Sequence, residues 1–92
     1  MKTIIKKESP EYSSEYVEHN GKRFRIYSEN GNSYCHVSVM VLTLNGNYDC
    51  IARRCDIPNT EKINFLWNEK LRLDGNRKNL EACKEFIKSL YD

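Results

Sequence analysis

The chain has 92 residues, with 15 basic and 13 acidic side chains and a formal net charge of +2. So balanced a charge does not predict nucleic-acid binding by itself, and any electrostatic binding surface has to be local. No apolar run approaches the roughly 20 residues of a membrane span, and residues 1–7 have no apolar signal-peptide core after their charges. We therefore expect a single cytoplasmic α+β domain spanning 1–92, with no membrane partner.

Residues 1–12 are expected to form a loose arm or an edge strand through residues 3–5. Beyond them, the Asn-Gly dipeptides at 20–21, 30–31 and 45–46 each separate two strand-like runs. Asn-Gly favours the type I′ hairpin turn, because both central residues of that turn need a positive φ. The three turns predict an antiparallel β-meander over 14–55. Its four strands are expected at 14–19, 22–29, 32–44 and 47–55.

Two-residue turns would also determine which residues face one another across the strands. The first turn then pairs His19 with Lys22, Glu18 with Arg23, Val17 with Phe24 and Tyr16 with Arg25. The second pairs Ser28 with Ser33, Tyr27 with Tyr34, Ile26 with Cys35, Arg25 with His36 and Phe24 with Val37. The third pairs Thr43 with Tyr48, Leu42 with Asp49, Val41 with Cys50, Met40 with Ile51, Val39 with Ala52 and Ser38 with Arg53.

These registers divide the side chains between two faces, since alternate residues of a strand point to opposite sides. One face is almost entirely apolar and is predicted to form the core: Val17, Phe24, Ile26, Cys35, Val37, Val39, Val41, Cys50 and Ala52. The other is polar and aromatic and is predicted to be exposed: Tyr16, Glu18, Arg23, Arg25, Tyr27, Tyr34, His36, Ser38, Met40, Ile51 and Arg53.

A C-terminal helix over 77–91 is predicted to cover the apolar face, with Asn76 as its N-cap. Its apolar residues recur at helical spacing: Leu80, Cys83, Phe86, Ile87, Leu90 and Tyr91. The charged residues fall on its other side: Lys78, Glu81, Lys84, Glu85 and Lys88.

The segment 56–73, between the meander and the helix, is predicted to be a loop followed by a strand pair or a short helix. Its aromatic and β-branched residues favour strands, and its charged residues favour a helix. We favour the strand pair, which would extend the meander to five or six strands. Trp67 would then close the core at the end of the sheet, or anchor an interface.

The four cysteines, at 35, 50, 55 and 83, are spaced C-x14-C-x4-C-x27-C and contain no C-x-x-C pair. Without such a pair a zinc site is weakly supported, and without a secretory context a disulfide framework is as well. We predict reduced thiols, with Cys35, Cys50 and Cys83 buried, and no metal or other cofactor. A metal site and a redox-active or disulfide pair are the alternatives.

The sequence contains no recognisable catalytic motif, such as G-x-S-x-G, a glycine-rich phosphate loop or H-E-x-x-H. His36 and Cys55 are predicted to lie opposite one another. No group that would orient the histidine, and no oxyanion hole, accompanies them in the sequence pattern. We therefore expect a protein that is not an enzyme.

The predicted exposed face provides the candidate binding residues: Tyr16, Arg23, Arg25, Tyr27, Tyr34, His36, Met40, Ile51 and Arg53. Arginine, methionine and aromatic side chains together are typical of a protein–protein hot spot. The same arginines and rings also suit single-stranded nucleic acid. Favourable cross-strand pairs, such as Glu18 with Arg23, would account for the face without any ligand.

Asn, Lys, Ile and Tyr make up 32 of the 92 residues, and these residues share AT-rich codons. Such a bias is typical of low-GC bacteria and of their phages and mobile elements. With the small size, it favours a phage-type accessory or inhibitor protein that occludes a surface of a larger host protein or complex. The alternatives are a nucleic-acid-binding module, or a homodimer joined through Met40 and Ile51 or through an exposed sheet edge.

Overall fold

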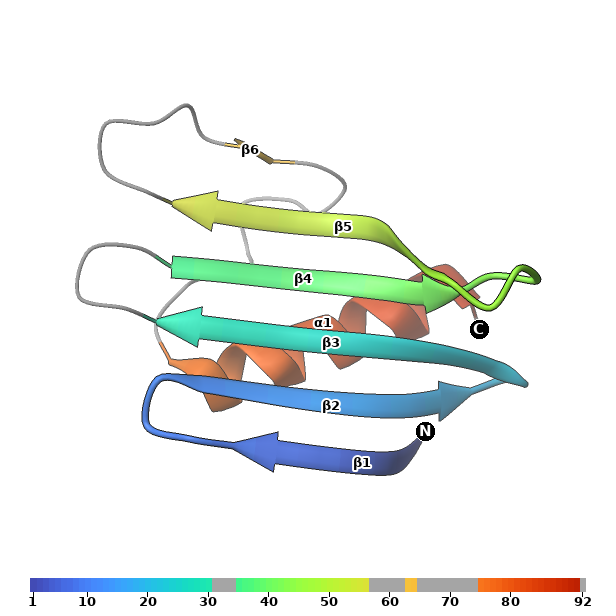
Figure 1. Ribbon diagram of the computed structural model, residues 1–92, viewed down its shortest axis with the longest axis horizontal. Coiled ribbons are helices and arrows are strands. Elements are labelled where there is room, and N and C mark those ends of the chain that lie inside the picture. The colour runs from blue at the N-terminus through green and yellow to red at the C-terminus, as the bar shows by residue number, and fades with distance from the viewer. Residues whose placement is uncertain (31–34, 57–62, 65–74, 92) are drawn as a thin grey trace.

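The computed structural model describes residues 1–30, 35–56, 63–64 and 75–91. Its strands are β1 (Lys2–Glu8), β2 (Tyr12–His19), β3 (Lys22–Asn30), β4 (Cys35–Leu42), β5 (Tyr48–Asp56) and β6 (Ile63–Asn64), followed by the helix α1 (Asn76–Tyr91). The strands form one antiparallel sheet in chain order, and α1 packs across β2, β3 and β4 (Figure 1). The predicted α+β meander with a C-terminal helix is confirmed.

The N-terminal residues form the edge strand β1, the second of the two predicted alternatives, and all seven of its residues are exposed. Its register with β2 shifts between Thr3 and Ile5. Lysines and a bulge on an edge strand hinder pairing with another chain. Both features argue against this edge as the place where two copies of the chain join.

The first hairpin has the predicted turn and register. Asn20 and Gly21 have φ values of 52° and 78°, as a type I′ turn requires. The pairs Glu18 with Arg23, Val17 with Phe24 and Tyr16 with Arg25 all form between β2 and β3.

The second hairpin has a different register from the predicted one, because β3 ends at Asn30 and β4 begins only at Cys35. The observed partners are Phe24 with Val41, Arg25 with Met40, Ile26 with Val39, Tyr27 with Ser38 and Ser28 with Val37. Phe24 thus faces Val41 in place of Val37, which is a displacement of four residues. An even displacement keeps every side chain on its predicted face. The connecting residues 31–34, including Tyr34, lie outside the described residues.

The third hairpin is wider than the predicted two-residue turn. Residues 43–47 form its loop, in which the Thr43 amide donates to the Asn47 carbonyl at 2.8 Å. Near the loop, Met40 therefore faces Cys50 in place of the predicted Ile51. A β-bulge between Val39 and Met40 corrects this offset.

The bulge reverses two predicted positions. Cys50, opposite Met40, lies on the outer side of the sheet and is exposed, so its predicted burial is wrong. Ile51 packs against the core, so its predicted place on the exposed face is wrong as well. Beyond the bulge the predicted pairs of Val39 with Ala52 and Ser38 with Arg53 are confirmed. One extra residue in β5 thus returns the rest of the strand to the predicted faces.

Only a short part of the segment 56–73 is described. β6 pairs with β5, with Ile63 opposite Cys55 and Asn64 opposite Arg54. The choice between a strand pair and a helix for the remaining residues, and the position of Trp67, lie outside the described residues.

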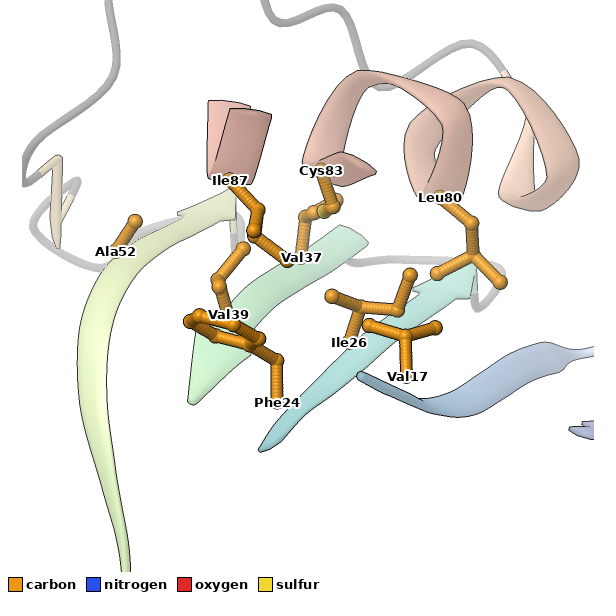
Figure 2. Packing of buried hydrophobic residues seen from close by; sticks show 9 residues of the cluster. All are labelled: Val17, Phe24, Ile26, Val37, Val39, Ala52, Leu80, Cys83 and Ile87. Carbon is orange, nitrogen blue, oxygen red and sulfur yellow. The ribbon is translucent and has the colours of Figure 1, made fainter. Parts of the chain in front are cut away.

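The core lies between α1 and the inner face of the sheet (Figure 2). It is formed by buried apolar side chains of both layers: Val17, Phe24, Ile26, Val37, Val39, Ala52, Leu80, Cys83 and Ile87. Burial raises the pKa of the Cys83 thiol to about 12, so this predicted buried cysteine stays protonated near neutral pH. Leu90 was predicted to face the core but is 52% exposed, because it lies in the last turn of α1. The side chains of Cys35 and Tyr91 lie outside the described part of the structure.

Polar contacts fix the start of α1 on the sheet. The Gly75 carbonyl accepts from the Asn79 amide at 2.9 Å, so Gly75 holds the cap position that was predicted for Asn76. The side chain of Asn76 instead accepts from Ser28 Oγ at 2.8 Å and donates to the Glu11 carbonyl at 3.1 Å. Buried Asn79 donates from Nδ2 to the same Ser28 Oγ at 3.0 Å.

An ion pair connects α1 to β2, and a hydrogen bond connects the same carboxylate to β1. The Glu15 side chain is 4% exposed and lies 3.1 Å from Lys84 Nζ. Thr3 of β1 donates its hydroxyl to the same carboxylate at 2.7 Å. Lys84 was predicted on the exposed side of the helix, but this contact leaves its side chain only 21% exposed.

We expect Gly21→Val to lower the free energy of unfolding by about 1–3 kcal/mol, because a β-branched residue resists positive φ. A Cβ at this position meets no atom within 4 Å, so backbone conformation alone causes the loss. Gly21→Asn is the matched control, because Asn adopts positive φ readily. Equal urea midpoints for the two variants would contradict the type I′ turn.

We expect Lys84→Met to lower the free energy of unfolding by about 2–3 kcal/mol, because it leaves the buried Glu15 carboxylate without its cation. Lys88→Met is the control, since Lys88 pairs with exposed Glu85 and should change stability by less than about 0.5 kcal/mol. Chemical denaturation of both variants measures the difference. A similar loss in the two would show that the Glu15 contact is not stabilising.

Candidate partner-binding face

The sheet surface opposite α1 carries the candidate binding residues, and we call it the outer face. The registers bring together seven of the predicted site residues: Tyr16, Arg23, Arg25, Tyr27, His36, Met40 and Arg53. Two of the nine do not belong to the described surface. Ile51 packs against the core, and Tyr34 lies outside the described residues.

Tyr27 is the centre of this face, and three neighbouring side chains hold its ring. Tyr12 stacks on it with ring centroids 6.0 Å apart and an interplanar angle of 21°. His36 meets it edge to face at 6.0 Å, and Arg25 Cζ lies 5.1 Å from the ring centroid. These contacts are the favourable geometries for aromatic pairs and for a cation over a ring.

The phenol of Tyr27 completes the cluster by donating a hydrogen bond to Glu29 Oε2. Burial of the phenol, followed by this hydrogen bond and the charge of Glu29, raises the pKa of Tyr27 from 10.0 to about 12. The phenol therefore remains a neutral donor at physiological pH. We call Tyr12, Arg25, Tyr27, Glu29 and His36 the Tyr27 cluster.

Small residues beneath the large side chains allow the cluster to lie against the sheet. Ser14 and Ser38 face Tyr27 from β2 and β4. They are only 7% and 2% exposed, although α1 lies on the other side of the sheet. Because serine is short, its exposure can be this low only when larger neighbours cover it. The outer face is therefore a packed layer of side chains.

Burial and two arginines act on the His36 imidazole. Burial lowers the pKa of His36 below its usual 6.5, and the charges of Arg53 and Arg25 lower it further, against the opposing charge of Glu29. His36 is therefore neutral near pH 7, so the arginines supply the positive charge at this position.

A second aromatic contact borders the Tyr27 cluster, where Tyr16 and Tyr48 meet edge to face with centroids 5.6 Å apart. Sequence reasoning missed both Tyr12 and Tyr48 as residues of the outer face. Tyr12 follows from the alternation of β2 once the strand is known to begin there. The position of Tyr48 opposite Leu42 depends on the bulge in β5, which no sequence signal marks.

Within the described residues, no group of three or more His, Cys, Asp and Glu side chains is arranged to hold a metal ion. The predicted register of His36 opposite Cys55 is confirmed, while the side chain of Cys55 lies outside the described part. The described residues also include no helix that is long and apolar enough to cross a membrane.

No protein-family model matches the chain, and comparison with curated proteins and with solved structures finds no significant match.

We expect Tyr27→Phe to remove a tyrosine ionisation with a midpoint near pH 12 from the absorbance titration of the folded protein. The folded protein favours the neutral phenol, which is why the pKa of Tyr27 is raised. The contribution of this phenol to stability is therefore complete below pH 10.0, where the tyrosine of the unfolded chain ionises, and is lost as the pH rises to about 12. The difference between the wild-type and variant titrations measures the midpoint. A midpoint at the ordinary tyrosine value would show that Tyr27 is not held in the cluster.

Proposed function

We propose that this is a non-catalytic binding protein that occludes a surface of a larger host protein through its outer face. The observation that supports it best is the order of the Tyr27 cluster, in which ring, cation and hydrogen-bond contacts hold one tyrosine. Side chains that are ordered before binding lose less conformational entropy when a partner arrives. Tyrosine and arginine are also enriched among the residues that contribute most to protein interfaces.

The same contacts favour a protein over a nucleic acid as the partner. Recognition of single-stranded nucleic acid uses aromatic ring faces on which bases stack. On Tyr27 those faces are in use, since Tyr12 stacks on the ring and Arg25 lies over it. The phenol proton of Tyr27 is also in use, since it is donated to Glu29 and is not free to bond a base or a phosphate.

The setting we propose is a phage or mobile element of a low-GC bacterium, for which the AT-rich codon bias and the small size are the support. A protein of this kind acts as an inhibitor by covering a functional surface of its target. The homodimer hypothesis is weaker than the sequence suggested, because Ile51 packs against the core and is not beside Met40 on the outer face. We therefore propose that the partner bound by the outer face is a different protein and not a second copy of this chain.

The test is affinity capture from a low-GC bacterial lysate with the wild type, Arg25→Glu and the control Arg77→Glu. Arg77 is an exposed residue of α1, so its reversal makes the same change of charge away from the outer face. We expect a nuclease-resistant protein to bind the wild type and the control and to be lost with Arg25→Glu. Arg25→Glu should change the free energy of unfolding by no more than about 1 kcal/mol, the order of one cation–π contact.

Three results would contradict the proposal. Capture that is lost on nuclease treatment would favour the nucleic-acid-binding module. Equal capture by wild type and Arg25→Glu would place the interface elsewhere. A wild-type dimer in sedimentation analysis that Arg25→Glu dissociates would make a second copy of the chain the occupant.

A further inference from the structure

The charge on the outer face is mostly positive. By register, five basic side chains lie on it: Lys2, Lys7, Arg23, Arg25 and Arg53. Two acidic side chains, Glu18 and Glu29, accompany them. Glu18 stands between Lys2 and Arg23 in the register, and Glu29 accepts the hydrogen bond of Tyr27.

In the described part of the chain, the arginines of β3 are not matched by carboxylates, in contrast to three of the lysines of β1 and α1. On β1 and α1, Lys6, Lys84 and Lys88 each lie within 4.0 Å of a carboxylate. Arg23 and Arg25, by contrast, form no ion pair with any of the residues that the structure describes. Two adjacent cations on one strand of the outer face thus remain available for a negative group.

Arg25 is the better placed of the two for specific recognition. Tyr16 faces it from β2 and Met40 from β4. Its guanidinium lies over the Tyr27 ring, which restricts the side chain, and a guanidinium in such a contact can still present a planar edge of N–H donors. A carboxylate matches that edge with two parallel hydrogen bonds. Tyr16 and Met40 are thus the cross-strand neighbours of Arg25 on either side, and both carry apolar surface.

We infer that the outer face binds an acidic segment of the partner protein, with carboxylates on Arg23 and Arg25 and an adjacent apolar side chain on Met40. This inference rests on the proposed function and specifies the chemistry of the partner. Positive charge on an interface raises the association rate with an acidic surface and disfavours basic ones. The segment is thus a run of Asp or Glu residues with an apolar neighbour.

The test uses a hexaglutamate peptide, a hexalysine peptide and an oligothymidine of the same length, each titrated into the full-length protein at low salt and followed by NMR. We expect hexaglutamate to shift the amide signals of β3 and β4 around Arg25 and Met40. The variant Arg23→Gln with Arg25→Gln should weaken this binding by about tenfold or more, because charge-assisted hydrogen bonds are lost. The matched control, Arg77→Gln with Lys78→Gln, removes the same charge from α1 and should leave it unchanged.

The outcomes separate this inference from the proposed function. Hexaglutamate binding that depends on the two β3 arginines supports the inference. Binding reduced equally in the α1 control means a general charge effect and overturns it. If hexaglutamate leaves the outer face unshifted while Arg25→Glu still abolishes capture of the host protein, the inference fails and the proposed function stands. Oligothymidine binding more tightly than hexaglutamate on this face would overturn both.

Discussion

The face to which each side chain of the described strands points depends on the alternation of residues between the two sides of the sheet. α1 can bury only one face, so Val17, Ile26 and Val39 must all point to that side although they come from three strands. A single-residue slip in any strand would expose its apolar residues and bury its polar ones. The connections must therefore conserve this alternation. The β3–β4 connection does so through an even displacement, and the β4–β5 connection through the bulge at Ile51.

The first hairpin could be predicted from the sequence because its signal is local. Asn20 and Gly21 both take positive φ, as the type I′ turn requires, and His19 pairs directly with Lys22 across the turn. The same dipeptide at 30–31 and 45–46 did not lead to two-residue loops. Strand pairing also reflects how the residues of the sheet pack against α1. A dipeptide does not show whether its own turn preference or this packing determines the register. The faces were predicted correctly wherever alternation survived, whereas Cys50 and Ile51 were exchanged by the bulge.

The sequence predicted most of the residues of the candidate site, but it did not predict the contacts among them. Arg25, Tyr27 and Met40 were predicted on the outer face and lie there. The prediction holds although β4 is displaced, because an even displacement leaves each residue on the same face. Which of them touch depends on register, so the contacts of Tyr27 with His36 and with Tyr12 could not be foreseen. The role of Glu29 was missed for a different reason. The hydrogen bond from Tyr27 joins residues two apart on one strand, a contact that needs both side chains to lean along the strand.

The two sides of the sheet hold separate sets of side-chain contacts. On the inner side, Glu15 with Lys84 and Ser28 with Asn79 are directional contacts that determine how α1 lies on the apolar core. The order of the outer face comes from contacts among its own side chains, above the short Ser14 and Ser38. Changes in the outer face therefore leave the inner contacts intact, because the two layers share only the backbone of the strands. Such a sheet can vary the residues of its outer face while the same core and helix maintain the fold.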